Sequence, residues 1–162
     1  MKRLWAPWRI EYIRSKKDEG CIFCDKPKME DKNGLILFRG KTAFTLMNLY
    51  PYTNGHLMVA PLRHIDSFGE LNKDERLEVL EQIDQSINAI SKVMNPDGYN
   101  VGANLGESAG AGIKDHIHFH VVPRWKGDTN FMPVLGGTKV QVEGLENSWE
   151  KLNPIFNGRI NA

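Results

Sequence analysis

Short hydrophobic segments separated by turn residues run through the chain from residue 34 onward. Gly, Pro and Asn stand between these segments, and the stretch "YPYTNG" is typical of a turn. Hydrophobic runs of this length, bounded by turn residues, predict β-strands. The pattern predicts strands over residues 35–38, 43–48, 56–60, 99–104 and 116–122, with a weaker indication over 134–142.

One long helical pattern lies between the third and fourth of these segments. Asn72 can cap its first turn, and Glu75 follows at the capping-box spacing, while Pro96 and Gly98 end the pattern. The apolar residues that recur at steps of three and four predict one buried stripe, made of Leu77, Leu80, Ile83, Ile87, Ile90 and Met94. The order of elements predicts an α+β domain with a mainly antiparallel sheet of about five strands.

The length of 162 residues predicts a single domain over 1–162. We expect an N-terminal arm over 1–20, a core over 21–142 and an irregular tail over 143–162. The arm mixes tryptophans with lysines and arginines. Either its aromatic residues pack on the domain, or it is a solvated basic segment.

The formal net charge of +1 makes a nucleic-acid partner unexpected. No segment approaches the roughly 20 apolar residues that span a membrane, and Pro7, Trp8 and Arg9 interrupt any signal-peptide core. We therefore expect a cytoplasmic protein without a membrane partner. In that compartment the two cysteines, Cys21 and Cys24, are not expected to form a structural disulfide.

Three of the five histidines stand at alternate positions in "HIHFHVV". On a strand, His116, His118 and His120 share one face, about 7 Å apart, while the apolar residues between them face the core. They could be surface histidines that alternate with core residues. They could also bind one metal, or at least one of them could act as a nucleophile or an acid/base group, since imidazole titrates near neutral pH.

The loop "LGESAGAGIKD" directly upstream favours the last alternative. Its glycines free the backbone to turn N–H groups toward an anion, and Ser108 adds a hydroxyl. Glycine-rich loops are often simple turns, so the loop gains its weight from leading straight into the histidine segment. This combination predicts a site for phosphate chemistry.

The quoted motifs resemble the histidine triad superfamily of nucleotide hydrolases and transferases. "HIHFHVV" matches its signature, and "NLYPYTNGHLMVAPLRHI" and "NLGESAGAG" are similar to its other segments in order and spacing. "RLWAPWRIEYI" and "VVPRWKGDTNFM" resemble the branch that contains diadenosine tetraphosphate phosphorylases. The resemblance covers residues 2–142 and implies the fold of that superfamily.

The resemblance also assigns roles by position. It implies that His118 attacks the α-phosphorus and forms a nucleotidyl-histidine intermediate, that His120 assists, and that Asn48 contacts the ribose. The implied phosphate-binding residues are Asn104, Ser108, Gly110, Ala111 and Gly112. Many members carry a Gly-Gln pair in this loop, whereas this chain has Gly110-Ala111-Gly112.

Two further residues near these segments leave alternatives open. His56 is either a supporting residue of the catalytic site or a packing residue. Trp125 either stacks on an adenine base or belongs to the core or an interface.

The motif "CIFC" has three interpretations. A redox site would need a preceding strand and a helix with an apolar stripe, and the polar sequence after Cys24 lacks that stripe. Two thiolates with two imidazoles make a tetrahedral zinc site, and the resemblance implies His64 and His116 as the other ligands beside Cys21 and Cys24. The third interpretation is a pair of unliganded cysteines. We expect a structural zinc ion and no organic cofactor.

The predicted activity is cleavage of dinucleoside polyphosphates by a protein that the resemblance implies is a homodimer. Phosphorolysis of diadenosine tetraphosphate by orthophosphate to ATP and ADP is favoured. Hydrolysis of dinucleoside polyphosphates or nucleoside phosphoramidates is the near alternative, and nucleotidyl transfer to a sugar phosphate is a weaker one. Two other classes stay open: a metallohydrolase with all three histidines on a catalytic metal, and a nucleotide-binding protein without turnover.

Overall fold

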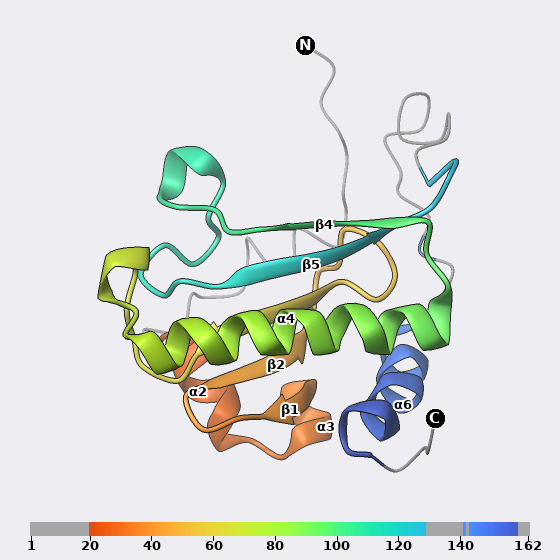
Figure 1. Cartoon of the computed structure of the whole chain (residues 1–162), viewed down its shortest axis with the longest axis horizontal. Coiled ribbons are helices and arrows are strands. Elements are labelled where there is room, and N and C mark those ends of the chain that lie inside the picture. Colours follow the sequence, from red (N-terminus) through yellow and green to blue (C-terminus); the bar gives the residue numbers. More distant parts are fainter. Residues whose placement is uncertain (1–19, 129–140, 142, 159–162) are drawn as a thin grey trace.

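A five-stranded antiparallel sheet forms the centre of the molecule (Figure 1). The computed structural model describes residues 20–128, 141 and 143–158. The predictions for the N-terminal arm and for a strand over 134–142 fall outside the described residues, except for Gly20 and Gln141. The strand order is β1-β2-β3-β5-β4. The strands are β1 Ile36–Arg39, β2 Ala43–Met47, β3 Leu57–Pro61, β4 Gly98–Gly102 and β5 Phe119–Arg124.

The sequence predicted all five of these strands, but it placed the start of the last one too early. β5 begins at Phe119, so His116 and His118 precede the strand that contains His120. The apolar residues of this segment nevertheless face the core as predicted, because Ile117, Phe119 and Val121 are buried in the main hydrophobic core. The α+β fold with a mainly antiparallel sheet and one long helix is confirmed.

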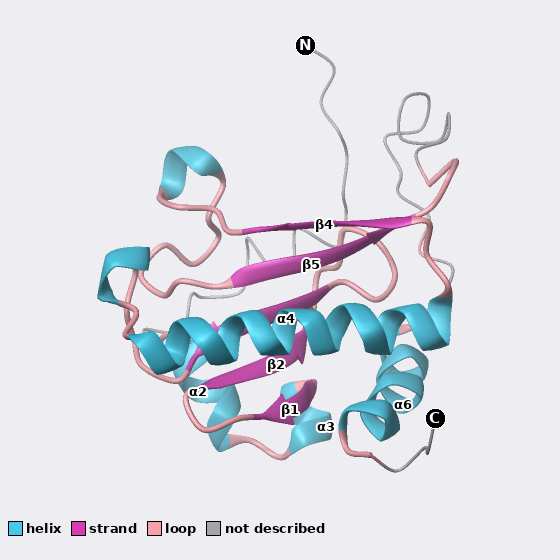
Figure 2. Ribbon diagram, in the orientation of Figure 1, coloured by secondary structure: helices cyan, strands magenta, loops and turns pink. Residues whose placement is uncertain are grey.

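Helix α4, Lys73–Met94, covers one face of the sheet (Figure 2). Its predicted capping box is present: Asn72 Oδ1 accepts from the Glu75 N–H, and the Glu75 carboxylate accepts from the Asn72 N–H. The predicted apolar stripe is partly wrong, because Leu77 and Leu80 are 56% and 64% exposed.

Polar side chains take inward positions on α4 that hydropathy alone assigns to leucine. Gln82 is buried, accepts a hydrogen bond from the Thr45 hydroxyl (2.8 Å) and donates to the Ala43 carbonyl (2.9 Å). Ser86 is also buried and donates to the Gln82 carbonyl. Because these bonds replace the water that each group loses, the helix turns a partly polar face toward the sheet.

The expected irregular tail is instead a helix, α6 Leu145–Phe156. Leu152 and Phe156 enter the main core, and the Trp149 Nε1–H donates to the Ile36 carbonyl. The helix packs on α4 and β1. Pro154 lies in the last turn of α6, where its missing N–H removes the usual hydrogen bond to the Glu150 carbonyl. The prediction failed because a single amphipathic helix of this length has little sequence signal outside its tertiary contacts.

The two faces of the sheet carry separate hydrophobic cores. Side chains alternate along β2 and β3, so one set packs under α4 and the other faces the opposite side. The opposite side is the histidine face, and its smaller core consists of Phe23, Ile36, Phe44, Leu46, Met58 and Ala60. The short helix α2, Ile22–Asp25, contributes Phe23 to it. Helix α2 leads through η1, Lys26–Lys28, and α3, Asp31–Gly34, to the start of β1.

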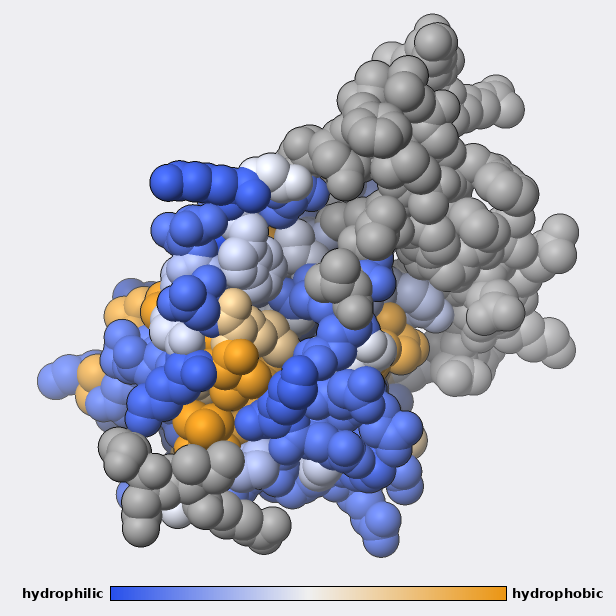
Figure 3. Space-filling model, turned by 90° about the vertical axis from the view of Figure 1, so that its right-hand side faces the viewer, coloured by the Kyte–Doolittle hydropathy of each residue, from blue (hydrophilic) through white to orange (hydrophobic). Residues whose placement is uncertain are grey.

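The surface in the view of Figure 3 is mostly hydrophilic, with hydrophobic residues gathered near the middle of that face. None of the helices in the described ranges is long and apolar enough to cross a membrane. The described residues also form two further single-turn helices. η2, Phe68–Glu70, lies between β3 and α4, and η3, Glu107–Ala109, lies in the loop between β4 and β5.

Candidate functional site

His56, directly before β3, and His120, on the neighbouring strand β5, form a hydrogen-bonded pair on the histidine face. The main-chain N–H of Tyr52 donates to His56 Nδ1 at 3.0 Å, so this nitrogen is unprotonated. In the neutral ring the proton is therefore on Nε2, which lies 2.9 Å from His120 Nδ1 and donates to it. His120 consequently carries its own proton on Nε2. Burial, with a smaller effect of His118, lowers the pKa of His120 to about 4, so the ring is neutral at pH 7.

The His118 ring is held in the tautomer that a nucleophile requires. Its Nδ1 lies 2.9 Å from the main-chain carbonyl of His116, and a carbonyl can only accept, so Nδ1 carries the proton. No hydrogen bond within the described residues uses His118 Nε2, and none of their buried side-chain nitrogens or oxygens lacks a partner, so Nε2 is open to solvent. Burial lowers the pKa of His118, which keeps this lone pair available at neutral pH.

The Nδ1 atom of His116 lies beside the cysteines. Its Nε2 donates to the Pro61 carbonyl at 2.8 Å, which leaves Nδ1 unprotonated. That Nδ1 lies 3.3 Å from Cys21 Sγ and 3.6 Å from Cys24 Sγ, and Cys24 Sγ lies 3.3 Å from His64 Nδ1. Three segments far apart in the sequence therefore converge on one point.

The four predicted ligands fit a tetrahedral metal. The donor atoms of Cys21, Cys24, His64 and His116 all lie within 4.8 Å of one another. Bond lengths of about 2.3 Å to sulfur and about 2.0 Å to nitrogen would place neighbouring ligands roughly 3.3–3.8 Å apart, which is close to the observed separations. Burial and the neighbouring Cys21 raise the pKa of the Cys24 thiol, so a bound cation would be needed to hold Cys24 as a thiolate at neutral pH.

The redox and catalytic-metal alternatives receive no support from this geometry. Helix α2 is only four residues long, and no strand among the described residues leads into it, unlike a thioredoxin-type motif. The donor nitrogens of the triad do not converge either, because His116 Nδ1 faces the cysteines while His118 Nδ1 donates to a carbonyl. Within the described residues, the one group of potential metal ligands is the Cys2His2 cluster.

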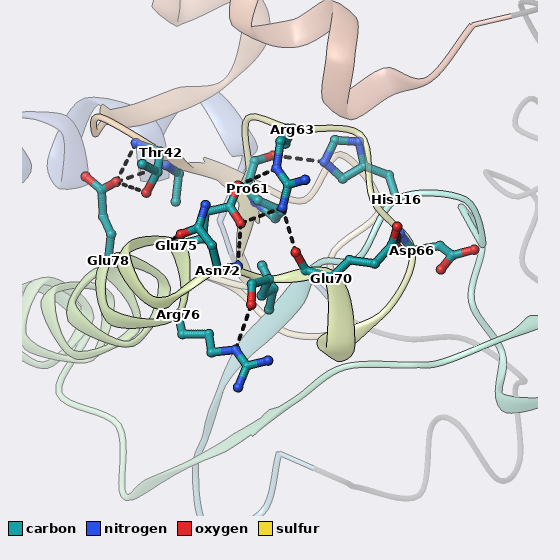
Figure 4. A network of polar contacts seen from close by, with 12 residues as sticks. Thr42, Pro61, Arg63, Asp66, Glu70, Asn72, Glu75, Arg76, Glu78 and His116 are labelled. Atoms are coloured by element: carbon teal, nitrogen blue, oxygen red, sulfur yellow. Dashed lines mark hydrogen bonds and ion pairs between the residues drawn. The ribbon is translucent and has the colours of Figure 1, made fainter.

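A buried carboxylate anchors the segment that carries His64 (Figure 4). Glu75 is 3% exposed, and Arg63 donates to both of its oxygens, at 2.8 and 2.9 Å. Arg63 also donates to the Glu70 carbonyl at 2.6 Å. The hydrogen bond from Arg63 lowers the pKa of Glu75. The sequence predicted Glu75 as a capping residue, but nothing in the spacing revealed that Arg63 shares the same carboxylate.

Asn48 lies beside the histidine pair. Its Oδ1 accepts from the Tyr50 N–H at 2.9 Å, and its Nδ2 lies 3.3 Å from His56 Nδ1. The side chain therefore braces the turn that precedes β3. It is half-buried and belongs to the same corner of the molecule as His120.

The glycine-rich loop is closed by its own hydrogen bonds. The N–H groups of Ala109 and Ala111 donate to the Gly106 carbonyl, and that of Gly110 donates to Glu107. Gly106 and Gly110 have φ values of 79° and 88°, which strongly favour glycine. The Asn104 amide reaches the Gly110 carbonyl at 3.5 Å. Among the described residues no hydrogen bond joins this loop to the histidines. Two of the expected backbone donors, the N–H groups of Gly110 and Ala111, are engaged within the loop itself.

Trp125 lies at the far end of β5 from His120. Trp125 is five positions after His120, which corresponds to about 17 Å of extended strand. The Trp125 indole N–H donates to the carbonyl of Asn95 at 3.3 Å, at the C-terminal end of α4. This contact gives the residue a place in the fold at a distance from the triad.

Known proteins resemble this chain in both sequence and fold. A curated relative from Mycobacterium tuberculosis (strain CDC 1551 / Oshkosh), named AP-4-A phosphorylase, is 41% identical over 149 residues, covering 86% of this chain and 76% of the relative. A hypothetical histidine triad nucleotide-binding protein from Sulfolobus tokodaii strain 7 has a TM-score of 0.68 and 24% identity, covering 85% of this chain and 93% of that one.

A zinc-bound histidine triad family protein from Mycobacterium smegmatis has the same fold, with a TM-score of 0.66 and 22% identity, covering 86% of this chain and 94% of that one. The profile of the HIT domain matches residues 30–127, which is more than half of the chain. Together with the relative from M. tuberculosis, this match shows that the chain belongs to the HIT (histidine triad) family.

Proposed function

We propose that this protein is an enzyme that cleaves dinucleoside polyphosphates through a nucleotide bound covalently to His118. The observation that carries the proposal is the state of the His118 ring. Its Nδ1 proton is committed to the His116 carbonyl, and its Nε2 lone pair is free of protein partners among the described residues. A neutral imidazole in this tautomer attacks phosphorus without prior loss of a proton.

In the first step, His118 Nε2 bonds to the α-phosphorus, and the bond from that phosphorus to the bridging oxygen of the leaving nucleotide breaks. The Nε2–H of His120 would donate to a phosphate oxygen or to the leaving oxygen. His56 holds the His120 ring through the 2.9 Å bond to Nδ1. Donors that already point at the reacting group stabilise its developing charge without reorganisation.

The remaining members of the proposed site bind the nucleotide. Asn48 contacts the ribose, which its position beside His56 supports. Asn104, Ser108, Gly110, Ala111 and Gly112 hold phosphates, after the loop has exchanged some of its internal bonds for bonds to the substrate. If Trp125 stacks on a base, that base lies far from the phosphorus that His118 attacks.

In the second step, orthophosphate attacks the phosphorus on His118, the phosphorus–nitrogen bond breaks, and a nucleoside diphosphate is released. Diadenosine tetraphosphate would thus give ATP in the first step and ADP in the second. The similarity to the AP-4-A phosphorylase from M. tuberculosis supports phosphate as the attacking group. Water in its place gives hydrolysis of dinucleoside polyphosphates, or of nucleoside phosphoramidates, through the same intermediate.

Product analysis separates these two outcomes. The protein is incubated with diadenosine tetraphosphate, with and without orthophosphate. We expect ADP and ATP only when phosphate is present. AMP and ATP in both samples would establish hydrolysis instead. Failure to recover labelled nucleotide on His118 in a quenched single turnover would refute the covalent route.

We also propose that the Cys2His2 cluster holds a structural zinc ion. Four protein ligands would complete its coordination sphere, and the metal would join α2 to the segments that carry His64 and His116. When bound, zinc supplies charge to hold the two thiolates and takes no part in phosphoryl transfer. Metal analysis of protein purified without chelator tests this: we expect one zinc per chain.

The quaternary structure and location complete the proposal. The single domain forms a homodimer in the cytoplasm. Strand β4 supports the dimer, because it lies at the edge of the sheet with Val101 46% exposed and could pair with a second copy. Light scattering on the purified protein should give twice the chain mass of 18.4 kDa. A monomeric mass at micromolar concentration would refute the proposed homodimer.

A further inference from the structure

We propose that Phe23 is a positioning residue for His118, and that the "CIFC" turn acts on the reaction through this ring. The inference rests on the proposed function, because it concerns the orientation of the proposed nucleophile. It adds a role for a residue that lies between the two cysteines and is not itself a metal ligand. The cluster would then contribute more than the stability of the fold.

The Phe23 ring stacks on the face of His118. Their centroids are 4.5 Å apart and their planes differ by 30°. The same ring lies 5.3 Å from the His116 ring at 47°. Phe23 is 1% exposed, so this contact is part of the interior and leaves no room for water on that face of His118.

The position of Phe23 follows from the turn that carries it. The N–H groups of Cys24 and Asp25 both donate to the Cys21 carbonyl, at 2.9 and 3.0 Å, which closes a single helical turn. Both cysteines direct their sulfurs toward His116, within 3.6 Å of its Nδ1. Between them the Phe23 side chain enters the small core of the histidine face. Bonds from both cysteines to one metal would fix this turn against the histidine segment.

Two different restraints then hold the His118 ring. The bond from Nδ1 to the His116 carbonyl acts in the plane of the ring, and the stacked Phe23 acts on its face. A flip of the ring about its Cβ–Cγ bond would exchange a nitrogen for a carbon at the carbonyl and would have to displace Phe23. The ring therefore stays with Nε2 directed toward the open side. A fixed orientation of the attacking atom is worth a large factor in rate.

A pair of matched variants tests the inference. Phe23→Leu removes the stacked ring, and Phe44→Leu removes a ring from the same small core. Phe44 is also fully buried, but no ring contact joins it to a histidine within the described residues. For Phe23→Leu we expect kcat to fall about tenfold or more with KM within about twofold, as for a lost orientation effect. For Phe44→Leu we expect kcat within about twofold of the wild type.

A second readout does not depend on turnover. Nitrogen-15 NMR of labelled histidines distinguishes the two tautomers, and His118 is assigned from the spectrum of His118→Asn. We expect one tautomer, with the proton on Nδ1, in the wild type and in Phe44→Leu, and a mixture in Phe23→Leu. Zinc content is measured on every sample.

Equal losses of kcat in the two leucine variants, or a single His118 tautomer in Phe23→Leu, would overturn the inference. If Phe23→Leu does not fold, Phe23→Met replaces it. If neither folds, the wild type is treated with a chelator. A mixed His118 tautomer after metal removal then supports the inference, and an unchanged tautomer overturns it. A wild type that carries no nucleotide on His118 contradicts the proposed function, while the NMR comparison still decides the role of Phe23.

Discussion

The two faces of the sheet bury polar side chains in opposite ways. On the face under α4, Thr45, Gln82 and Ser86 are fully or almost fully buried, and their hydrogen bonds are made to one another or to the main chain. On the other face, His116 and His118 are also buried, but each spends only one ring nitrogen on a main-chain carbonyl. The first arrangement completes a core.

The second arrangement leaves donor atoms available for chemistry. His116 Nδ1 faces the cysteine cluster, and His118 Nε2, which no hydrogen bond within the described residues uses, is the atom that we propose as the nucleophile. Burial alone therefore does not distinguish a histidine that only stabilises the fold from one that is available for chemistry. What distinguishes them is whether the protein engages both ring nitrogens in hydrogen bonds. The predictions below test this distinction by removing one group at a time.

Removal of the imidazole that we propose as the nucleophile should have the largest effect. For His118→Ala we expect turnover of diadenosine tetraphosphate to fall by at least about 10³-fold, as for other enzymes that lose a covalent nucleophile. Zinc content should be unchanged, because His118 is not part of the Cys2His2 cluster. A parallel loss of metal and activity would instead favour a metal held by all three histidines.

Loss of one cysteine should separate stability from chemistry on the same face. For Cys21→Ser we expect zinc to be lost and the free energy of unfolding to fall by roughly 3 kcal/mol or more, because the metal binds only the folded chain. Denaturant unfolding with metal analysis measures both. Full metal content in Cys21→Ser would refute Cys21 as a ligand.

Features that follow from local sequence patterns were predicted correctly, whereas features that depend on tertiary contacts were missed. Strand positions and the capping box follow from spacing. The cysteines of the cluster come from the motif "CIFC", and the resemblance to a family supplied His64 and His116. The inward face of α4 was misread because Gln82 finds partners on β2, which no pattern along the helix reveals. The early start given to β5 has a similar origin. Alternation continues through His116 and His118, but strand pairing begins only at Phe119.

The contacts between residues of the site likewise could not be predicted from the sequence. The pairing of His56 with His120 spans 64 residues, and that of Arg63 with Glu75 joins a loop to a helix cap. The stacking of Phe23 on His118 depends on α2 lying across the sheet. In each case the residue types are ordinary, and only their placement gives them a role.

A buried pair on the α4 face should affect stability and leave catalysis intact. Gln82→Leu removes the acceptor of the Thr45 hydroxyl, which is fully buried. We expect a loss of about 2 kcal/mol in the free energy of unfolding, with kcat unchanged. The double variant Gln82→Leu/Thr45→Val should recover much of this loss, because both polar partners are then absent. A fall in kcat in the single variant would show that the two faces are coupled.

Acid should produce the smallest of these effects, through His120. Its pKa is about 4 in the folded protein, against 6.5 for an unperturbed histidine. Between these values the unfolded chain binds a proton that the folded protein does not, so stability falls as pH decreases from about 6.5 toward 4. Because the ring is only partly buried, we expect about 1 kcal/mol from this residue between pH 7 and pH 5. Urea unfolding at the two pH values measures it.

The matched variant for this measurement is His120→Gln, which removes the titrating ring and keeps a polar side chain. The cysteine cluster also binds protons as pH decreases, so the informative quantity is the difference between the wild type and the variant at each pH. That difference should shift by about 1 kcal/mol in favour of the variant at pH 5. An equal pH dependence in both proteins would mean that His120 is protonated in the folded state well above pH 4. The hydrogen bond that it accepts from His56 would then not persist in solution.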